Sequence, residues 1–105
     1  MKTKIAVIEG QRKVVARIDG CSCAVKDYIE KRTGLIVDDP SILLRPTYKA
    51  SAKCHPNDEF DVNVGKNLAS DRAREKYENA FNNALDNAKE ICWKIIDLPW
   101  KGGCR

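Results

Sequence analysis

Side chains between residues 60 and 72 have the chemistry needed to bind an anionic ligand. Arg72 can hold a phosphate group through two parallel hydrogen bonds, and Lys66 can add a positive charge. Phe60 offers a ring on which a flat group can stack, while Asn63 and Asp71 can hydrogen-bond to hydroxyl groups or base edges. The candidate ligand-binding residues are therefore Phe60, Asn63, Lys66, Asp71 and Arg72.

The same side chains also have purely structural interpretations. Phe60 stands where a strand is expected to lead into a helix, and hydrophobic residues often staple a helix start there. Arg72 can pair with a neighbouring carboxylate on a solvent-exposed helix face, and Asp58 and Asp61 fit the role of helix caps. The sequence by itself leaves both interpretations open.

The chain lacks the arrangements that enzymatic catalysis requires. Its only histidine, His55, directly follows Cys54, and neighbouring residues of a strand point to opposite faces, so the two cannot form a nucleophile–base pair. Neither a Ser/His/Asp arrangement, nor a paired-carboxylate motif, nor a glycine-rich phosphate loop is present. We therefore expect a binding protein rather than an enzyme.

The cysteines favour neither disulfides nor a metal site. An odd count of five with one C-x-C pair makes a poor disulfide framework. Cys21, Cys23, Cys54 and His55 include enough ligand types for zinc, but their spacings match no common zinc site. We expect reduced, mostly buried thiols, no metal and no cofactor.

Length and charge restrict the class of protein. The 105 residues suffice for one domain, and the formal net charge of +4 is a mild bias that is compatible with an anionic small ligand. No apolar run approaches the roughly 18 residues of a membrane span, and no signal sequence opens the chain. We expect a cytosolic protein without a membrane partner.

The hydrophobic pattern predicts a single α+β domain that places the candidate residues where a strand leads into a helix. Residues 4–8 and 13–18 are β-rich runs joined by a turn, and residues 47–54 alternate with period two. We expect a small antiparallel sheet of three or four strands, a short inserted helix and a long or broken C-terminal helix. The predicted organisation over residues 1–105 is a hairpin at 1–20, an insertion at 21–40, a strand at 41–56, a helix at 57–98 and a tail at 99–105.

The insertion is expected to carry a helix over residues 21–33 that stops at Gly34. Residues 35–37 are a candidate strand fragment, and residues 42–44 are expected to resume the sheet. Insertions at a sheet corner often form a ligand lid or a subunit contact.

An apolar seam runs along the C-terminal helix. Its members recur at spacings of 4, 3, 4, 3 and 4 and are Tyr77, Phe81, Ala84, Ala88, Ile91 and Ile95. Such a seam either pairs with a second copy, which predicts a homo-oligomer of two or more chains, or packs on the domain's own sheet. The opening turns are out of phase with it, so we expect a bend near residues 70–74 or a change of packing partner there.

The junction resembles a signature of small phage and prophage proteins from Gram-positive bacteria. In those proteins a strand ending in Cys-x-Pro-x-Asp-x-Phe-Asp leads into a helix with Gly-x-x-x-Ala-x-x-Arg-Ala, and residues 54–61 and 65–73 have these patterns here. Among characterised groups, the chain most resembles the first Thoeris anti-defence family. The matching part is about a quarter of the chain, and the 21–40 insertion departs from the family's short members.

That resemblance implies a function without catalysis. Members of the family are sponges that bind cyclic ADP-ribose isomers released by bacterial TIR enzymes, in pockets between subunits of dimers or larger assemblies, and some also hold cyclic oligonucleotides at separate sites. Here Arg72 and Lys66 would hold the pyrophosphate, Phe60 the adenine, and Asn63 and Asp71 the riboses or the base edges. The protein would act in the cytoplasm of the infected host.

Two other hypotheses come from different classes of protein. In the first, the helix seam docks onto a host protein and the chain is an inhibitor or adaptor. In the second, basic side chains bind nucleic acid weakly, although the mild net charge does not favour such a partner. The residues for this second hypothesis are Lys49, Lys53, Lys66, Arg72 and Arg74. Binding that falls steeply with salt would identify it.

Overall fold

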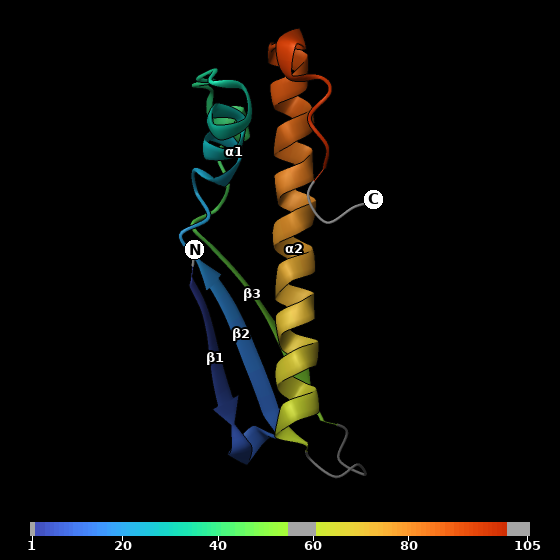
Figure 1. The fold of residues 1–105 in the computed structure, drawn as a ribbon. Helices are drawn as coiled ribbons and strands as arrows, with labels where there is room; N and C mark the ends of the chain where they lie inside the picture. The colour runs from blue at the N-terminus through green and yellow to red at the C-terminus, as the bar shows by residue number, and fades with distance from the viewer. Residues whose placement is uncertain (1, 55–60, 101–105) are drawn as a thin grey trace.

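The protein, described by a computed structural model over residues 2–54 and 61–100, is an elongated α+β fold of 53 × 23 × 19 Å. Three antiparallel strands, β1 (Lys2–Ile8), β2 (Lys13–Asp19) and β3 (Thr47–Lys53), lie in this order in one sheet. One long helix, α2 (Val62–Ile91), spans the length of the molecule beside them (Figure 1). A short helix, α1, packs near the far half of α2. The predicted fold class is confirmed.

The sheet begins with the expected hairpin. Strand β1 (Lys2–Ile8) pairs with β2 (Lys13–Asp19), and a 3-10 turn, η1 (Glu9–Gln11), joins them. Arg12 closes this turn with a φ of 51°, and its N–H donates to the carbonyl of Glu9 at 3.0 Å. Strand β3 (Thr47–Lys53) pairs with the other side of β2, so β1 and β3 are the two edges.

The third strand is shorter than the 41–56 segment predicted. Residues 40–42 form a 3-10 turn, η2 (Pro40–Ile42), because the Asp39 side chain accepts a hydrogen bond from the Ser41 N–H at 2.8 Å. Ile42 and Leu44 are buried but do not pair in the sheet, and residues 35–37 form no strand either. Apolar side chains in this segment therefore reflect core packing rather than strand pairing.

The inserted helix has the predicted type with a later start. Helix α1 (Ala24–Thr33) ends at Gly34, which adopts the left-handed conformation at φ 75° and donates its N–H to the carbonyl of Glu30. This stop confirms the prediction from the sequence, since glycine reaches positive φ without steric cost. Val25 and Ile29 are fully buried beneath the helix.

Helix α2 (Val62–Ile91) is one unbroken helix through residues 70–74. Its packing partner changes instead: Ala69 and Ala73 lie on the sheet, and further along Phe81 meets Tyr28 of α1. The predicted helix end at residue 98 is wrong by several residues. Cys92 is extended, and a 3-10 turn, η3 (Trp93–Ile95), follows and buries Ile95 in the core.

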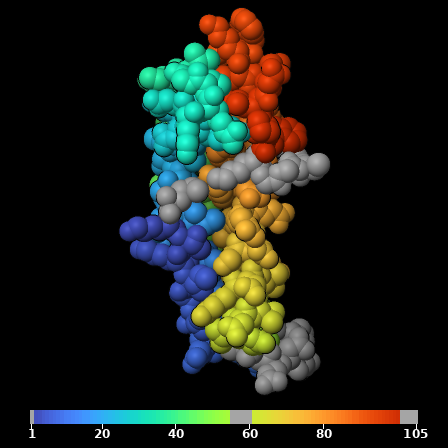
Figure 2. Space-filling view, in the orientation of Figure 1, coloured from blue at the N-terminus to red at the C-terminus, as the bar shows by residue number. Residues whose placement is uncertain are grey.

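The apolar seam is mostly covered inside the chain itself. Tyr77, Phe81, Ala84 and Ala88 are buried in the core, whereas Ile91 keeps 49% of its surface exposed. In the space-filling view, the segment containing α1 lies directly against the C-terminal part of α2 (Figure 2).

Among the described residues, no helix combines the length and apolar character that crossing a membrane requires.

Candidate functional site

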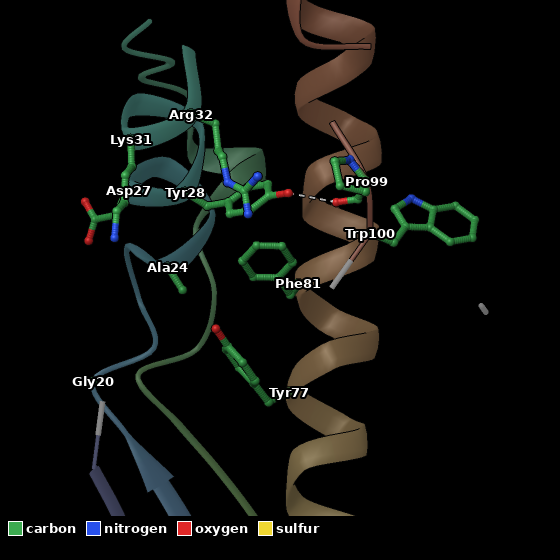
Figure 3. A pocket seen from close by; sticks show the side chains of 10 residues that line it. All are labelled: Gly20, Ala24, Asp27, Tyr28, Lys31, Arg32, Tyr77, Phe81, Pro99 and Trp100. Atoms are coloured by element: carbon green, nitrogen blue, oxygen red, sulfur yellow. Dashed lines mark hydrogen bonds between the residues drawn. The ribbon is translucent and has the colours of Figure 1, made fainter. Parts of the chain in front are cut away.

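A pocket of about 510 Å³ lies where α1, α2 and the segment after η3 meet (Figure 3). This volume is within the roughly 300–1,000 Å³ typical of small-molecule sites. Its lining residues are Gly20, Ala24, Asp27, Tyr28, Lys31, Arg32, Tyr77, Phe81, Pro99 and Trp100. Three separate parts of the chain therefore contribute to one open cavity.

Helix α1 supplies the polar and cationic side of this pocket. Tyr28 and Arg32 are four residues apart and share one helix face, and the Arg32 guanidinium carbon lies 5.3 Å from the centre of the Tyr28 ring. Asp27 and Lys31 have the same spacing along α1 and also line the pocket. The cations outnumber the single carboxylate on this side, so the rim favours an anion.

Aromatic rings from α1 and α2 form the apolar part of the pocket. Tyr28 meets Phe81 edge-on at 5.3 Å between ring centres, and Phe81 meets Tyr77 in the same manner at 6.1 Å. Tyr77 in turn contacts Tyr48 of β3 at 6.0 Å. Edge-to-face contacts at these separations are favourable. The four rings thus connect the sheet to α1, and three of them line the pocket.

The C-terminal segment closes one side of the pocket by two hydrogen bonds. The Tyr28 hydroxyl donates to the carbonyl of Pro99 at 3.0 Å, and the Trp100 Nε1–H donates to the Asp86 carboxylate at 2.7 Å. Figure 3 shows the Trp100 indole directed away from Tyr28, toward the outside of α2. Trp100 therefore anchors the segment to α2, and Pro99 forms the wall.

Among the described residues, the positions predicted from the sequence are spread over several surroundings. Phe60 lies outside the described residues. Asn63 is exposed in the first turn of α2, where its N–H donates to the Asp61 side chain, and Lys66 is half-buried. Asp71 forms an ion pair with Arg74 at 2.7 Å.

Arg72 contacts the edge of the sheet. Its Nη1 donates to the carbonyl of Ser51 at 3.0 Å, and one helical turn later Lys76 donates to the carbonyl of Lys49 at 3.0 Å. These carbonyls belong to β3, an edge strand, so the two side chains cover acceptors that would otherwise remain available to another chain. Arg72 thus has a structural role whether or not it also binds a ligand.

Asp71 and Arg72 line different hollows, each of about 370 Å³. Asp71 faces Thr3 and Ile18 across a groove between α2 and β1, whereas Arg72 borders a hollow against β3. Neighbouring residues of a helix are separated by about 100° around its axis, which explains the separation. Neither hollow contains two aromatic rings beside a cation.

Sequence reasoning missed Tyr28, Lys31 and Arg32 as candidate ligand contacts. The available signal was the basic and aromatic i,i+4 spacing within the insertion, a segment type that often forms a lid. Nothing local indicates that Tyr28 meets Phe81, because the two residues are separated by more than fifty positions in the chain.

The pocket has the chemistry of binding. Its rings and cations match a flat anionic ligand, and no thiol, serine or histidine lines it. Within residues 2–54 and 61–100, no three His, Cys, Asp or Glu side chains gather as metal ligands would.

The chain matches no protein-family model, and neither a curated protein nor a solved structure is significantly similar to it.

Proposed function

We propose that this protein binds and sequesters a cyclic nucleotide signal in the pocket between α1, α2 and the C-terminal segment. The observation that carries the proposal is the placement of the Arg32 guanidinium over the Tyr28 ring, which in turn meets Phe81, in a pocket that Lys31 also lines. A nucleotide presents the complementary pair of features, a flat base and an anionic phosphate. Aromatic faces stack bases, and arginine binds phosphate through paired hydrogen bonds.

The identity of the signal rests on the resemblance of residues 53–73 to the phage signature. It points to a cyclic ADP-ribose isomer, with cyclic oligonucleotides as further ligands of the same class. In this proposal the protein is a phage anti-defence sponge that blocks Thoeris-type immunity in the cytoplasm of the infected bacterium. Sequestration needs affinity alone, which agrees with a pocket lined by rings and cations and by no thiol, serine or histidine.

Titration calorimetry with cyclic ADP-ribose isomers tests this proposal. Arg32→Ala removes a charge-assisted hydrogen bond of roughly 1.5–3 kcal/mol, so the affinity should fall by about tenfold to a hundredfold or more. Arg45→Ala is the matched control, because Arg45 is exposed and does not line this pocket. The control should bind like the unaltered protein, and both variants should keep their circular dichroism spectra.

The same titration separates the two candidate sites. Loss of binding in Arg72→Ala or Phe60→Ala, with normal binding in Arg32→Ala, would place the ligand at the start of α2 instead. No heat of binding with any cyclic ADP-ribose isomer would refute the proposed ligand.

A protein-binding role is the second candidate, and exposed apolar side chains favour it. Trp93 is 76% exposed, Ile36 67% and Ile96 61%. Apolar exposure of this size often marks an interface. Capture of one defined host protein by the unaltered chain, lost in Trp93→Asp, would support this role.

A further inference from the structure

The face of the sheet opposite α2 collects positive charge from all three strands. Strand residues alternate between faces, and the buried set on β2, Val14, Ala16 and Ile18, packs toward α2. The residues of β2 that alternate with this buried set point to the other face of the sheet. Their partners on β1 and β3, which lie directly opposite them in the register, point to the same face. This basic face consists of Lys2, Lys4, Ala6, Ile8, Lys13, Val15, Arg17, Asp19, Thr47, Lys49, Ser51 and Lys53.

Charge on the basic face is one-sided. It holds six of the 19 lysines and arginines of the chain but only one of the 15 aspartates and glutamates. The face therefore carries a formal charge of +5, and the rest of the chain carries −1. The net charge of the whole chain is only +4, but all of the excess positive charge lies on this one face.

The cations stand in rows across the strands. Lys4, Arg17 and Lys49 lie directly opposite one another on β1, β2 and β3, and Lys13 lies opposite Lys53. Like charges in directly opposed positions destabilise a sheet. A row of three cations is thus unfavourable for folding by itself and becomes favourable when an anion lies across it.

The single carboxylate offsets only one end of the face. Asp19 accepts from Arg17 at 3.1 Å and from the Thr47 hydroxyl at 3.0 Å. Among the described residues, no ion pair involves Lys4, Lys49 or Lys53. These ammonium groups are exposed to solvent and available to an external anion.

The positive surface continues around the edge of β3. Lys13, Lys49 and Lys76 line a shallow hollow of about 300 Å³, together with Val15, Ala50 and Ser51. Lys76 reaches this hollow from α2, where its ammonium donates to the carbonyl of Lys49. The hollow brings three cations around one space that is large enough to admit a phosphate group.

We propose that the basic face binds double-stranded nucleic acid through its phosphate backbone, without sequence preference. A duplex carries one charge per about 1.7 Å of its axis, the dense and regular anion that rows of cations complement. The face has no aromatic side chain on which unpaired bases could stack, so it favours a duplex over a single strand. This role goes beyond nucleotide sequestration and uses the end of the molecule away from α1 (Figure 1).

Fluorescence anisotropy with a short labelled DNA duplex of mixed sequence tests the inference. If four or five phosphates are contacted, log K should fall with log salt with a slope of about −4 between about 50 and 200 mM salt. The double variant Lys4→Gln with Lys49→Gln should reduce that slope by about 2 and weaken binding by about tenfold to a hundredfold. The matched control, Lys89→Gln with Lys94→Gln, loses the same charge from the end of α2 and from η3, away from the sheet, and should bind like the unaltered protein.

A single charge reversal separates binding from folding. Lys4→Glu should abolish duplex binding while leaving the melting temperature unchanged or higher, because the new carboxylate relieves repulsion opposite Arg17. Equal weakening in the control pair would show that net charge alone attracts the duplex and would overturn the inference. Tighter binding to a single strand, or binding only to phosphatidylserine vesicles, would also overturn it.

Discussion

Gly65 illustrates how one missing side chain positions α2 on the sheet. A Cβ at this position would lie 2.7 Å from Cγ2 of Val14, which is fully buried on β2. Ala69 and Ala73 follow at four-residue intervals and are also fully buried. Small residues therefore face the sheet, and the larger Tyr77 and Phe81 begin where the sheet ends.

Gly65→Ala should destabilise the protein, although alanine ordinarily stabilises a helix interior by about 1 kcal/mol relative to glycine. Val14 is β-branched and enclosed, so overpacking costs about 1–3 kcal/mol and outweighs that gain. Urea unfolding monitored by circular dichroism measures the change.

The control for this prediction is a double-mutant cycle with Val14→Ala. Removing the valine methyl groups makes room for the new Cβ, so the double variant should be more stable than the sum of the single changes implies, by about 0.5–3 kcal/mol. Additive effects, or a more stable Gly65→Ala protein, would contradict the close approach.

At the scale of elements, the stability of α2 depends on the hydrogen bonds that cap its first turn. The Asp61 side chain accepts from the N–H groups of Asn63 at 2.9 Å and Val64 at 3.3 Å, which confirms the cap expected at this position. These are two of the four amides that a helix start leaves without a backbone partner. The cap also marks where the chain reverses from β3 toward α1.

Asp61→Ala should lower the free energy of unfolding by about 1 kcal/mol, because two amides lose their acceptor. For a domain of this size that corresponds to about 4–8 °C in melting temperature. Asp61→Asn is the matched control, since asparagine caps helices about as well as aspartate and removes the charge alone. Equal losses in both variants would assign the effect to charge rather than to capping.

At the scale of the whole molecule, one end remains apolar and uncovered. The exposed side chains come from residues 36–43 and from residues 91–96 at and after the end of α2. The Asn87 side chain joins these two parts by donating to the carbonyl of Ser41 at 3.4 Å. They are Ile36, Leu43, Ile91, Trp93 and Ile96. We propose that this end, rather than the buried part of the seam, forms the contact of a homo-oligomer.

Light scattering at micromolar concentration should therefore give the mass of a dimer or a larger assembly. Ile91→Asp and Trp93→Asp should each lower that mass, because a charge without a partner is costly in an apolar contact. Ile8→Asp, at the other end of the molecule, should leave the mass unchanged. A monomeric unaltered protein, or dissociation in the Ile8 variant alone, would contradict this arrangement.

Local features of the chain were predictable because they depend on residues a few positions apart. The hairpin follows from two β-rich runs joined by a turn, the stop of α1 from Gly34, and the cap of α2 from Asp61. Backbone sterics and first-turn hydrogen bonds act within one or two turns, so short windows of sequence contain the information. The α+β class follows from the same windows.

Tertiary structure alone decided which distant residues share a surface. Helix α2 covers one side of the sheet, and the lysines of β1, β2 and β3 therefore lie together on the other side. The net charge of +4 does not indicate this local concentration of positive charge. Packing also placed Tyr28 against Phe81, made Ile42 a core residue rather than a strand residue, and ended α2 at Ile91 so that Ile95 could be buried. These outcomes depend on burying apolar area between segments far apart in the chain, and that free energy exceeds the small local preferences that a sequence pattern reports.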